Sequence, residues 1–556
     1  MPEPVRPRPS SSQPAERVEV LTSANRSSHS AVNAVNLAAL LLAALTLLMF
    51  VVFFALPADD AYIVGRYVRQ LYSGNGLVFN PGERINALTS PLHTLVIAVI
   101  HPLSRVPVDV YRIAAATLTA WTLIAIARRA YAAKPDAMLF LALTLASPFV
   151  CFWGIGGLET PLLLCACSCL TWLALSATPE GGPARALRII GLATAAVLIR
   201  YDSILYVAPV AVLFLSWFRT DARVIAATIV CTVLALGWVA FTYVYYGDVL
   251  PTSFYVKLAG PTEGPAEVVR GVGYVLSFAV LTLVLPAALP RLWKRTESRP
   301  HAQITTMLAL GVAAEAVYGV FAGDKHMMYA YRLFVPYLPS LVLLLSNARA
   351  SREPASPGRP TRSAWVFLCL GYQTLMGIFL YYFSENPNLS LVFRKQRAGD
   401  ELYEFSTLGA RHTKSFLGAV RASATEIGVH WNKLPDRESR PMRIAVLTGG
   451  TLPYYLPEAY TLETLVSYRH HCEANLVSFA DYIQFIQDAD APSSIVQHYG
   501  SEAAAWTLVS KHEMTVQGLQ DKPFRLRVDI WYQKRPAPVT LPSGINEPCR
   551  EPQLGS

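Results

Sequence analysis

The stretch Asp59-Asp60-Ala61-Tyr62-Ile63 directly follows the first long apolar run of the chain, which extends from Ala31 to Leu56. That run is long enough to cross a bilayer as one helix, because a crossing needs about 20 mostly apolar residues. Two adjacent carboxylates therefore stand where the chain passes from hydrocarbon to water. Ionisable groups at such a boundary are costly and usually line a functional cavity. The structural alternative is a helix cap with a solvated surface charge.

The composition is typical of a multi-pass membrane protein. Of the 556 residues, 53% are hydrophobic and only 15% are charged, whereas soluble domains carry about 25% charged residues. Residues 1–30 are rich in Pro, Ser and Arg, and they hold too little apolar surface to fold. We therefore expect a disordered N-terminus (1–30), a transmembrane domain (31–383), a water-exposed α/β domain (384–535) and a flexible tail (536–556).

The apolar segments predict a topology. The expected crossings, about eleven in number, are residues 31–56, 110–128, 137–153, 157–176, 187–199, 203–217, 224–246, 270–290, 304–322, 329–347 and 364–383. The basic links between them fall on one side, with the basic N-terminus, if Ser90–Val106 lies on the membrane surface rather than crossing. The short segments 187–199 and 203–217 could be two crossings or one kinked helix, and this topology requires two. Lys and Arg mark the cytoplasmic side. Asp59, Asp60 and everything after Phe383 are then expected outside a bacterial plasma membrane.

With this topology, acidic, basic and aromatic side chains gather in the outward-facing loops. They are Asp59, Asp60, Glu159, Arg200, Asp202, Asp248, Lys257, Asp324, Tyr331 and Arg332. A lipid-linked sugar needs such a set, because Arg and Lys hold phosphate oxygens and a carboxylate can take a proton from an attacking hydroxyl. A lipid or glycan transporter is the alternative, although transporters more often have inverted repeats, and we find none in the sequence. The sequence also lacks a Gly-rich nucleotide-binding loop, which agrees with a lipid-linked donor.

A series of short motifs runs along the chain. They are Asp59-Asp60-Ala61, Arg66-Tyr67, Gly74 to Arg84, Thr89-Ser90-Pro91-Leu92, Gly157 to Pro161, Arg200-Tyr201-Asp202, Tyr246 to Pro251, Gly323-Asp324 with Tyr331-Arg332, and Gly450 to Tyr455. As a series, over residues 31 to about 456, they resemble the GT-C membrane glycosyltransferases. More narrowly, they are similar to the mycobacterial terminal arabinofuranosyltransferases. The chain departs from that group at Tyr201, where the group often has Pro, and after Tyr455.

The resemblance implies a mainly helical, GT-C-like membrane fold and transfer of a sugar from a polyprenyl-phosphate donor to a cell-envelope glycan or glycoconjugate. The expected sugar is arabinofuranose, with a hexose such as mannose as the alternative. Asp59 and Asp60 are the expected catalytic pair: one takes the acceptor proton and the other orients it or a divalent metal, with Asp60 ranked equal to or behind Asp59. The expected donor contacts are Arg200, Lys257 and Arg332 for the phosphate, and Glu159, Asp202, Asp248, Asp324 and Tyr331 around it. No nucleic-acid partner is expected.

The C-terminal region reads as a small α/β domain. Met442–Leu447 is a buried apolar run that ends at glycines, which predicts a strand. Ala474–Asp488 has helical spacing, and Phe524–Gln533 alternates like a half-exposed strand. Cys472 and Cys549 could form a disulfide if this domain lies outside the cell.

Overall fold

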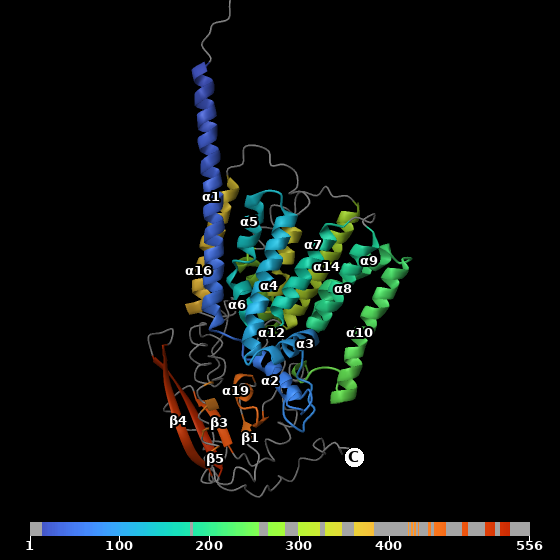
Figure 1. Ribbon diagram of the computed structural model, residues 1–556, viewed down its shortest axis with the longest axis vertical. Helices are drawn as coiled ribbons and strands as arrows, with labels where there is room; N and C mark the ends of the chain where they lie inside the picture. Colours follow the sequence, from blue (N-terminus) through green and yellow to red (C-terminus); the bar gives the residue numbers. More distant parts are fainter. Residues whose placement is uncertain are drawn as a thin grey trace, which may run out of the picture.

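The structure is a computed structural model. It describes residues 14–177, 182–254, 265–283, 299–322, 329–346, 361–382 and 450–462, together with 421, 424–425, 428–429, 432, 443–445, 481–486, 506–517 and 523–533. The predicted mainly helical fold is confirmed. A helical bundle has the long α1 (Pro14–Phe54) along one side and α10 (Ala222–Tyr246) along the other (Figure 1). Between them lie α4 (Pro107–Ala130), α5 (Lys134–Leu143), α6 (Pro148–Ile155), α7 (Thr160–Leu175), α8 (Pro183–Ile199), α9 (Ile204–Trp217), α12 (Pro265–Leu281), α14 (Arg299–Ala322), α15 (Leu338–Ser346) and α16 (Thr361–Tyr382).

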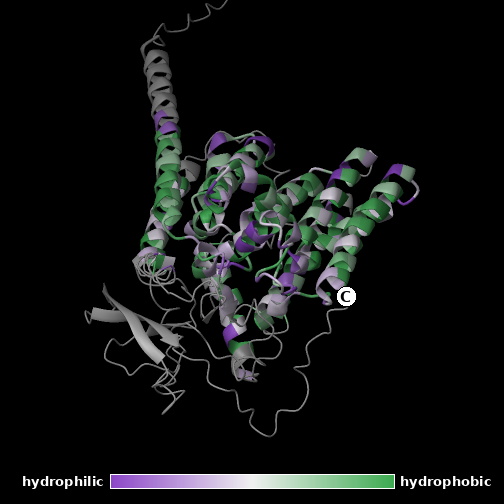
Figure 2. Ribbon diagram, turned by 60° about the horizontal axis from the view of Figure 1, so that its bottom comes forward, coloured by the Kyte–Doolittle hydropathy of each residue, from purple (hydrophilic) through white to green (hydrophobic). Residues whose placement is uncertain are grey.

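Several of these helices can cross a membrane. Within the described ranges, five are long and apolar enough, namely α4, α10 and the apolar parts of α1, α14 and α16. The pair α5 and α6, bent by 64°, passes the same test together. Among the described residues, the other predicted crossings overlap with shorter helices. Figure 2 shows the hydrophobic character of α1 and the bundle. These features and the fold compared below indicate a multi-pass membrane protein.

The structure bears on two points of the predicted topology: the segments 187–199 and 203–217, and the segment 90–106. Helices α8 and α9 are separate, are joined by the short turn η3 (Tyr201–Ser203), and pack against each other, which excludes one kinked helix. Helix α3 (Pro91–Ile100) and the turn η1 (His101–Leu103) are too short to count among the long spans. They lie with α2 (Ala61–Tyr72) at one end of the bundle (Figure 1). We call this end the α2 end.

The N-terminal expectation differs from the structure. Helix α1 begins at Pro14, so part of the stretch predicted to be disordered is helical. A physical reason is that adding a turn to an existing helix is much easier than nucleating one, and the apolar run supplies that helix. Pro is also favoured at the first helical position.

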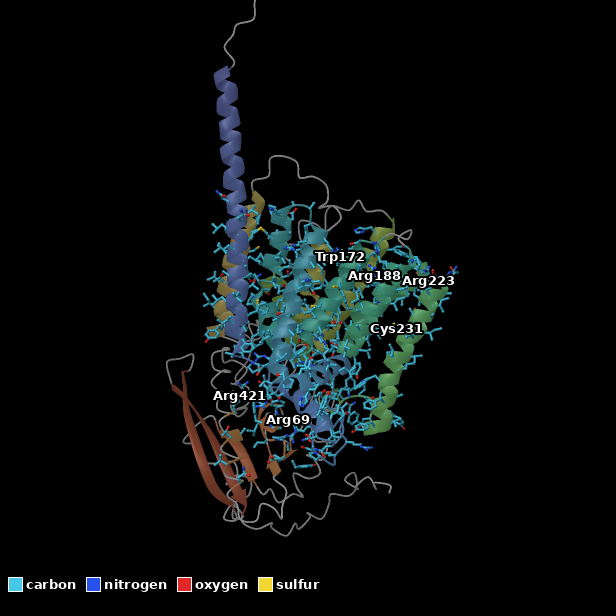
Figure 3. All side chains as sticks on the ribbon, in the orientation of Figure 1. Arg69, Trp172, Arg188, Arg223, Cys231 and Arg421 are labelled. Carbon is cyan, nitrogen blue, oxygen red and sulfur yellow. The ribbon has the colours of Figure 1, made fainter. Side chains whose placement is uncertain are left out.

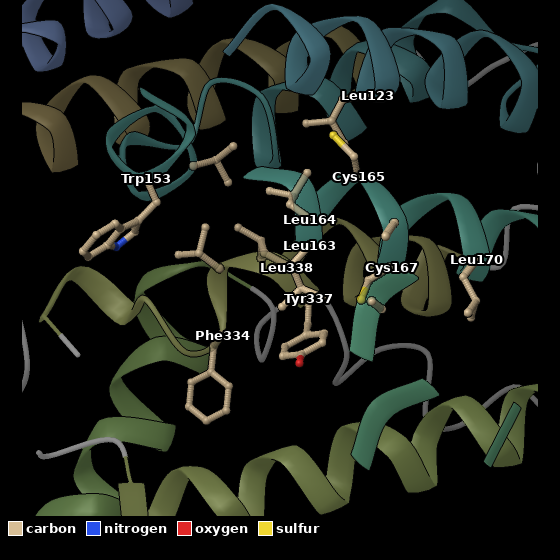
Figure 4. Packing of buried hydrophobic residues seen from close by; sticks show 14 of the residues in the cluster. Leu123, Trp153, Leu163, Leu164, Cys165, Cys167, Leu170, Phe334, Tyr337 and Leu338 are labelled. Atoms are coloured by element: carbon tan, nitrogen blue, oxygen red, sulfur yellow. The ribbon is translucent and has the colours of Figure 1, made fainter. Parts of the chain in front are cut away.

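An apolar core fills the bundle around α6, α7 and the segment before α15. Trp153, Leu163 and Leu338 are fully buried. Figure 4 shows them with Phe334 and Tyr337, which belong to the segment 329–338. This segment therefore packs in the core, and it leads into the site described below.

The C-terminal region forms a five-stranded mixed sheet in the order β2-β1-β3-β5-β4. The strands are β1 (Arg443–Ala445), β2 (Tyr460–Leu462), β3 (Asp481–Ile486), β4 (Trp506–Gln517) and β5 (Pro523–Gln533). Strand β1 runs parallel to β2 and β3, whereas β5 runs antiparallel to β3 and β4. The sheet lies at the α2 end (Figure 1).

Three sequence predictions concern this region. The strand at Phe524–Gln533 is confirmed as β5, and β1 falls inside the strand expected at Met442–Leu447. The helix expected at Ala474–Asp488 is wrong, because residues 481–486 form β3. The aromatic and β-branched residues there suit a pleated sheet once a partner strand is available, and β5 supplies it. Cys472 and Cys549 lie outside the described residues.

Candidate active site

Three charged side chains from distant parts of the sequence meet at the α2 end. Arg332 Nη2 donates to Oε1 and Oε2 of Glu159, at 3.1 and 3.3 Å, and Arg332 Nη1 lies 3.5 Å from Asp60 Oδ2. Asp60 precedes α2 and Glu159 precedes α7. The Arg332 and Glu159 side chains are 12% and 4% exposed, whereas that of Asp60 is 24% exposed. The structure thus brings together three of the predicted site residues, and Asp60 is the most accessible of the three.

The charge of Glu159 depends on its basic neighbours. Burial alone would raise the pKa of this carboxyl, but the positive charges of Arg332 and Arg200 outweigh burial and lower the pKa to about 2. Glu159 is therefore ionised at neutral pH and holds Arg332 in a buried ion pair. With Asp60 ionised, the cluster has two negative charges and one positive charge.

The segment that carries Arg332 has an unusual backbone. Ala330 and Tyr331 have φ of 47° and 56°, and the left-handed region costs a residue with a Cβ roughly 1–2 kcal/mol. Neighbours hold this shape: Trp153 Nε1 donates to the Ala330 carbonyl at 2.9 Å, and Arg200 Nη2 donates to the Leu333 carbonyl at 3.2 Å. The strained turn aims Arg332 at the carboxylates.

Tyr331 lies in the core behind this cluster. Its side chain is fully buried, and its ring packs against Phe149, Tyr274 and Phe278 with centroids 5.2–5.5 Å apart. This position does not fit the expected contact with the donor. Tyr331 instead helps to fix the strained turn.

Arg200 forms an ion pair with a residue of its own loop. Its Nε and Nη2 donate to the two carboxylate oxygens of Asp202 at 2.7 and 2.8 Å, and the same Nη2 reaches the Leu333 carbonyl. Both side chains are mostly buried, at 12% and 14% exposed. The expected phosphate and sugar ligands Arg200 and Asp202 therefore face each other, and they support the segment that carries Arg332.

The sequence analysis did not single out Glu315. This residue lies on α14 with 2% of its surface exposed, and Tyr337 Oη donates to its Oε1 at 2.8 Å. Tyr337 follows Arg332 by five residues, so this bond is a second support for the same segment. The signal was available, because an acidic residue inside an apolar span is rare and usually has a function.

Asp59 has different partners from Asp60. Its Oδ2 accepts the Gly450 N–H at 2.9 Å and its Oδ1 accepts the Thr451 N–H at 2.8 Å. It thereby caps α19 (Thr451–Tyr455), which belongs to the C-terminal region. A Cβ at Gly450 would lie 1.8 Å from the Asp59 carbonyl oxygen, so only glycine allows this approach. The Asp59–Asp60 pair therefore joins two structures: the Arg332 cluster and the 450–462 segment.

Two sequence motifs, one within α2 and one after it, also hold the C-terminal segment 450–462. The buried Arg66 guanidinium donates to the Leu456 carbonyl at 3.0 Å and also to the carbonyls of Pro453 and Ala459. Asn80 exchanges two hydrogen bonds with the backbone of Thr461, both at 2.9 Å. The resemblance rested partly on Arg66-Tyr67 and Gly74 to Arg84, and the structure explains both as docking elements for residues 450–462.

The remaining predicted site residues are not joined to the cluster by the described contacts. Asp248 lies in an exposed loop after α10. Lys257 and Asp324 lie outside the described residues.

The divalent metal considered at Asp59 and Asp60 stays a prediction, because in this structure both carboxylates have other partners. Both oxygens of Asp59 accept backbone N–H groups, and Asp60 faces a guanidinium. Within the described ranges, no group of three or more His, Cys, Asp or Glu side chains could hold a metal ion. We therefore assign no step to a metal.

The fold has a counterpart among solved structures. It resembles ArnT from Cupriavidus metallidurans, solved with bound undecaprenyl phosphate, with a TM-score of 0.52 and 14% sequence identity over 89% of this chain and 98% of ArnT. No protein-family model and no curated protein sequence matches the chain. The similarity shows that the chain shares the fold of ArnT, in agreement with the expected helical membrane fold, and at this identity it shows the fold alone.

Proposed function

We propose that this protein is a membrane glycosyltransferase that takes a sugar from a polyprenyl-phosphate donor and transfers it to a hydroxyl of a cell-envelope glycan or glycoconjugate. The observation that supports this most is the cluster of Asp60, Arg332 and Glu159 at one end of the helical bundle. The ArnT structure was solved with undecaprenyl phosphate, so a fold of this kind accommodates such a lipid.

Asp60 is the proposed general base. It is the most exposed member of the cluster, and Arg332 orients its carboxylate. In the reaction, Asp60 takes the proton of the acceptor hydroxyl, and the acceptor oxygen bonds to the anomeric carbon. The bond from that carbon to the phosphate oxygen breaks, and polyprenyl phosphate leaves with the electron pair. Arg332 stabilises the charge that develops on the leaving phosphate.

The charge of the cluster requires a second cation. Two carboxylates and one guanidinium give a net charge of −1, which repels a phosphate. We propose Lys257 for this role, because the sequence places it after Asp248 on the same side of the membrane. Asp324 stays a proposed contact of the sugar. Arg200 and Asp202 act indirectly, because they hold the segment that carries Arg332.

The resemblance supports arabinofuranose as the sugar, and the distribution of Lys and Arg supports a site on the outer face of a bacterial plasma membrane. No step of this proposal uses the divalent metal that the sequence analysis considered.

Purified protein in detergent, given a polyprenyl-phosphate sugar and an envelope glycan, tests the proposal. We expect a new glycosidic bond and release of polyprenyl phosphate, faster with arabinofuranose than with mannose. Movement of the lipid across a vesicle membrane without any new bond would indicate a transporter and refute the proposal. Transfer of mannose alone would refute the arabinofuranose assignment and leave the reaction class intact.

A further inference from the structure

A basic hollow lies at the α2 end, apart from the carboxylate cluster. It has a volume of about 520 Å³ and is lined by Arg69, His101, Pro102, Leu103, Ser104 and Arg105. None of these lining residues is acidic. The imidazole of His101 stacks on Tyr72 of α2 with the ring centroids 4.7 Å apart, which holds η1 against α2. Two guanidinium groups beside an open hollow suit an anionic group such as a phosphate.

An apolar row of exposed side chains lies along the chain before, within and after the segment 101–105 that lines the hollow. Leu95, Val99, Leu103 and Val106 are 56%, 69%, 82% and 53% exposed. Leu95 and Val99 lie one turn apart on α3, Leu103 ends η1, and Val106 directly precedes α4. Pro107 then begins α4, a helix long and apolar enough to cross the membrane. Arg105 is therefore two residues from the start of a span, at the level where lipid headgroups meet hydrocarbon.

The hollow is separate from the proposed reaction site. Arg69 follows Asp60 by nine residues on α2, which corresponds to about 13 Å along a helix. Its Nη1 donates to the Tyr454 carbonyl at 2.6 Å, and its guanidinium lies over the Tyr454 ring. An anion bound at Arg69 would thus lie next to the docked C-terminal segment and not at the carboxylates.

We propose that this hollow binds the phosphate headgroup of an anionic phospholipid from the surrounding leaflet. The phosphate accepts hydrogen bonds from Arg69 and Arg105, and the acyl chains cover the apolar row of α3 and η1. The location at the start of a span favours a bilayer lipid. The phosphate of such a lipid lies at the headgroup level, as the two arginines do, and its acyl chains lie in the hydrocarbon, as the apolar row does. The bound lipid would fix α2, the helix that begins next to Asp60, against the membrane surface.

The test uses the full-length protein in neutral detergent, with phosphatidylglycerol as the probe and phosphatidylcholine as the zwitterionic reference. Arg105 is exposed, so Arg105→Glu should fold, and melting curves check this. A basic residue near the surface contributes about 1 kcal/mol to binding of anionic lipid, roughly fivefold in affinity. The reversal changes the charge by two, so phosphatidylglycerol should bind about 25-fold more weakly, on the same scale. Arg188→Glu is the matched control, because Figure 3 places Arg188 and Arg69 at opposite ends of the bundle.

Equal binding of the two phospholipids by the parent, or an unchanged affinity in Arg105→Glu, would overturn the proposal. Displacement of phosphatidylglycerol by inorganic phosphate at similar concentration would overturn it too, because the hollow would then be a site for free anions. Preferential displacement by polyprenyl phosphate would overturn it in favour of a donor site.

Discussion

The substitution Asp59→Ala should show that Asp59 and Asp60 have different functions, because only Asp59 holds residues 450–462. Asp59 accepts hydrogen bonds from the backbone N–H groups of Gly450 and Thr451 at 2.9 and 2.8 Å. A hydrogen bond to a charged group contributes about 1.5–3 kcal/mol, so the loss of both weakens docking of residues 450–462 by roughly 3–6 kcal/mol. Asp59→Asn keeps one acceptor oxygen and should lose about half of this amount. Asp60→Asn should leave the docking unchanged, because the Asp60 carboxylate faces Arg332 and not the backbone of residues 450 and 451.

Hydrogen exchange of the backbone amides in residues 450–462 measures this docking directly. Opening that becomes easier by 3–6 kcal/mol raises the exchange rate by roughly 10²- to 10⁴-fold. Asp60→Asn is the matched control, since it removes a neighbouring carboxylate of the same size. Equal protection in Asp59→Ala and in the parent would show that Asp59 does not hold this segment. The proposal that Asp59 and Asp60 have different roles would then be refuted.

Three further predictions concern the cluster. Arg332→Ala should weaken binding of a polyprenyl-phosphate sugar by roughly tenfold to a hundredfold, the loss of one charge-assisted contact, and unchanged binding would place the phosphate elsewhere. Arg200→Lys keeps the charge but loses the bidentate contact with Asp202; if it acts through Arg332, adding it to Arg332→Ala should cost little more in transfer rate, and fully additive losses would contradict that. Because the pKa of Glu159 is lowered to about 2, its ion pair is fully formed above its usual pKa of 4.5 and is lost only as the pH falls towards 2. The effect of Glu159→Gln on donor binding should therefore be the same from pH 5 to pH 8, and an effect that varies across this range would argue against it.

The sequence predicts the helical fold well for a physical reason. Hydrocarbon demands long apolar segments whose backbone bonds are satisfied internally, so the spans are visible as composition. The positions of the long apolar helices follow from this. The strand at β3 was missed because a short apolar run reads equally as helix or strand, and only its pairing with β5 decides.

The candidate site was predictable in part. Asp60, Glu159 and Arg332 were singled out because ionisable residues at the ends of apolar segments are costly, and the fold brings them together. The roles of Asp59, Arg66 and Asn80 could not be read, because each depends on backbone groups of residues 450–462, far along the chain. When a side chain binds backbone groups far along the chain, the neighbouring sequence does not indicate which groups these are. Because the Asp59 carboxylate caps the 450–462 segment, we propose Asp60 rather than Asp59 as the base.

The measurement that tests the central claim most directly is the rate of sugar transfer by Asp60→Asn. Purified parent and variant receive the same polyprenyl-phosphate sugar and glycan acceptor, at saturating donor, and product is followed in the steady state. Asn keeps the shape of the side chain and removes the base, so the rate should fall about 10²- to 10⁴-fold, while donor binding changes little. Transfer by Asp60→Asn at the rate of the parent would contradict the account, because the cluster would then contain no base for the acceptor hydroxyl.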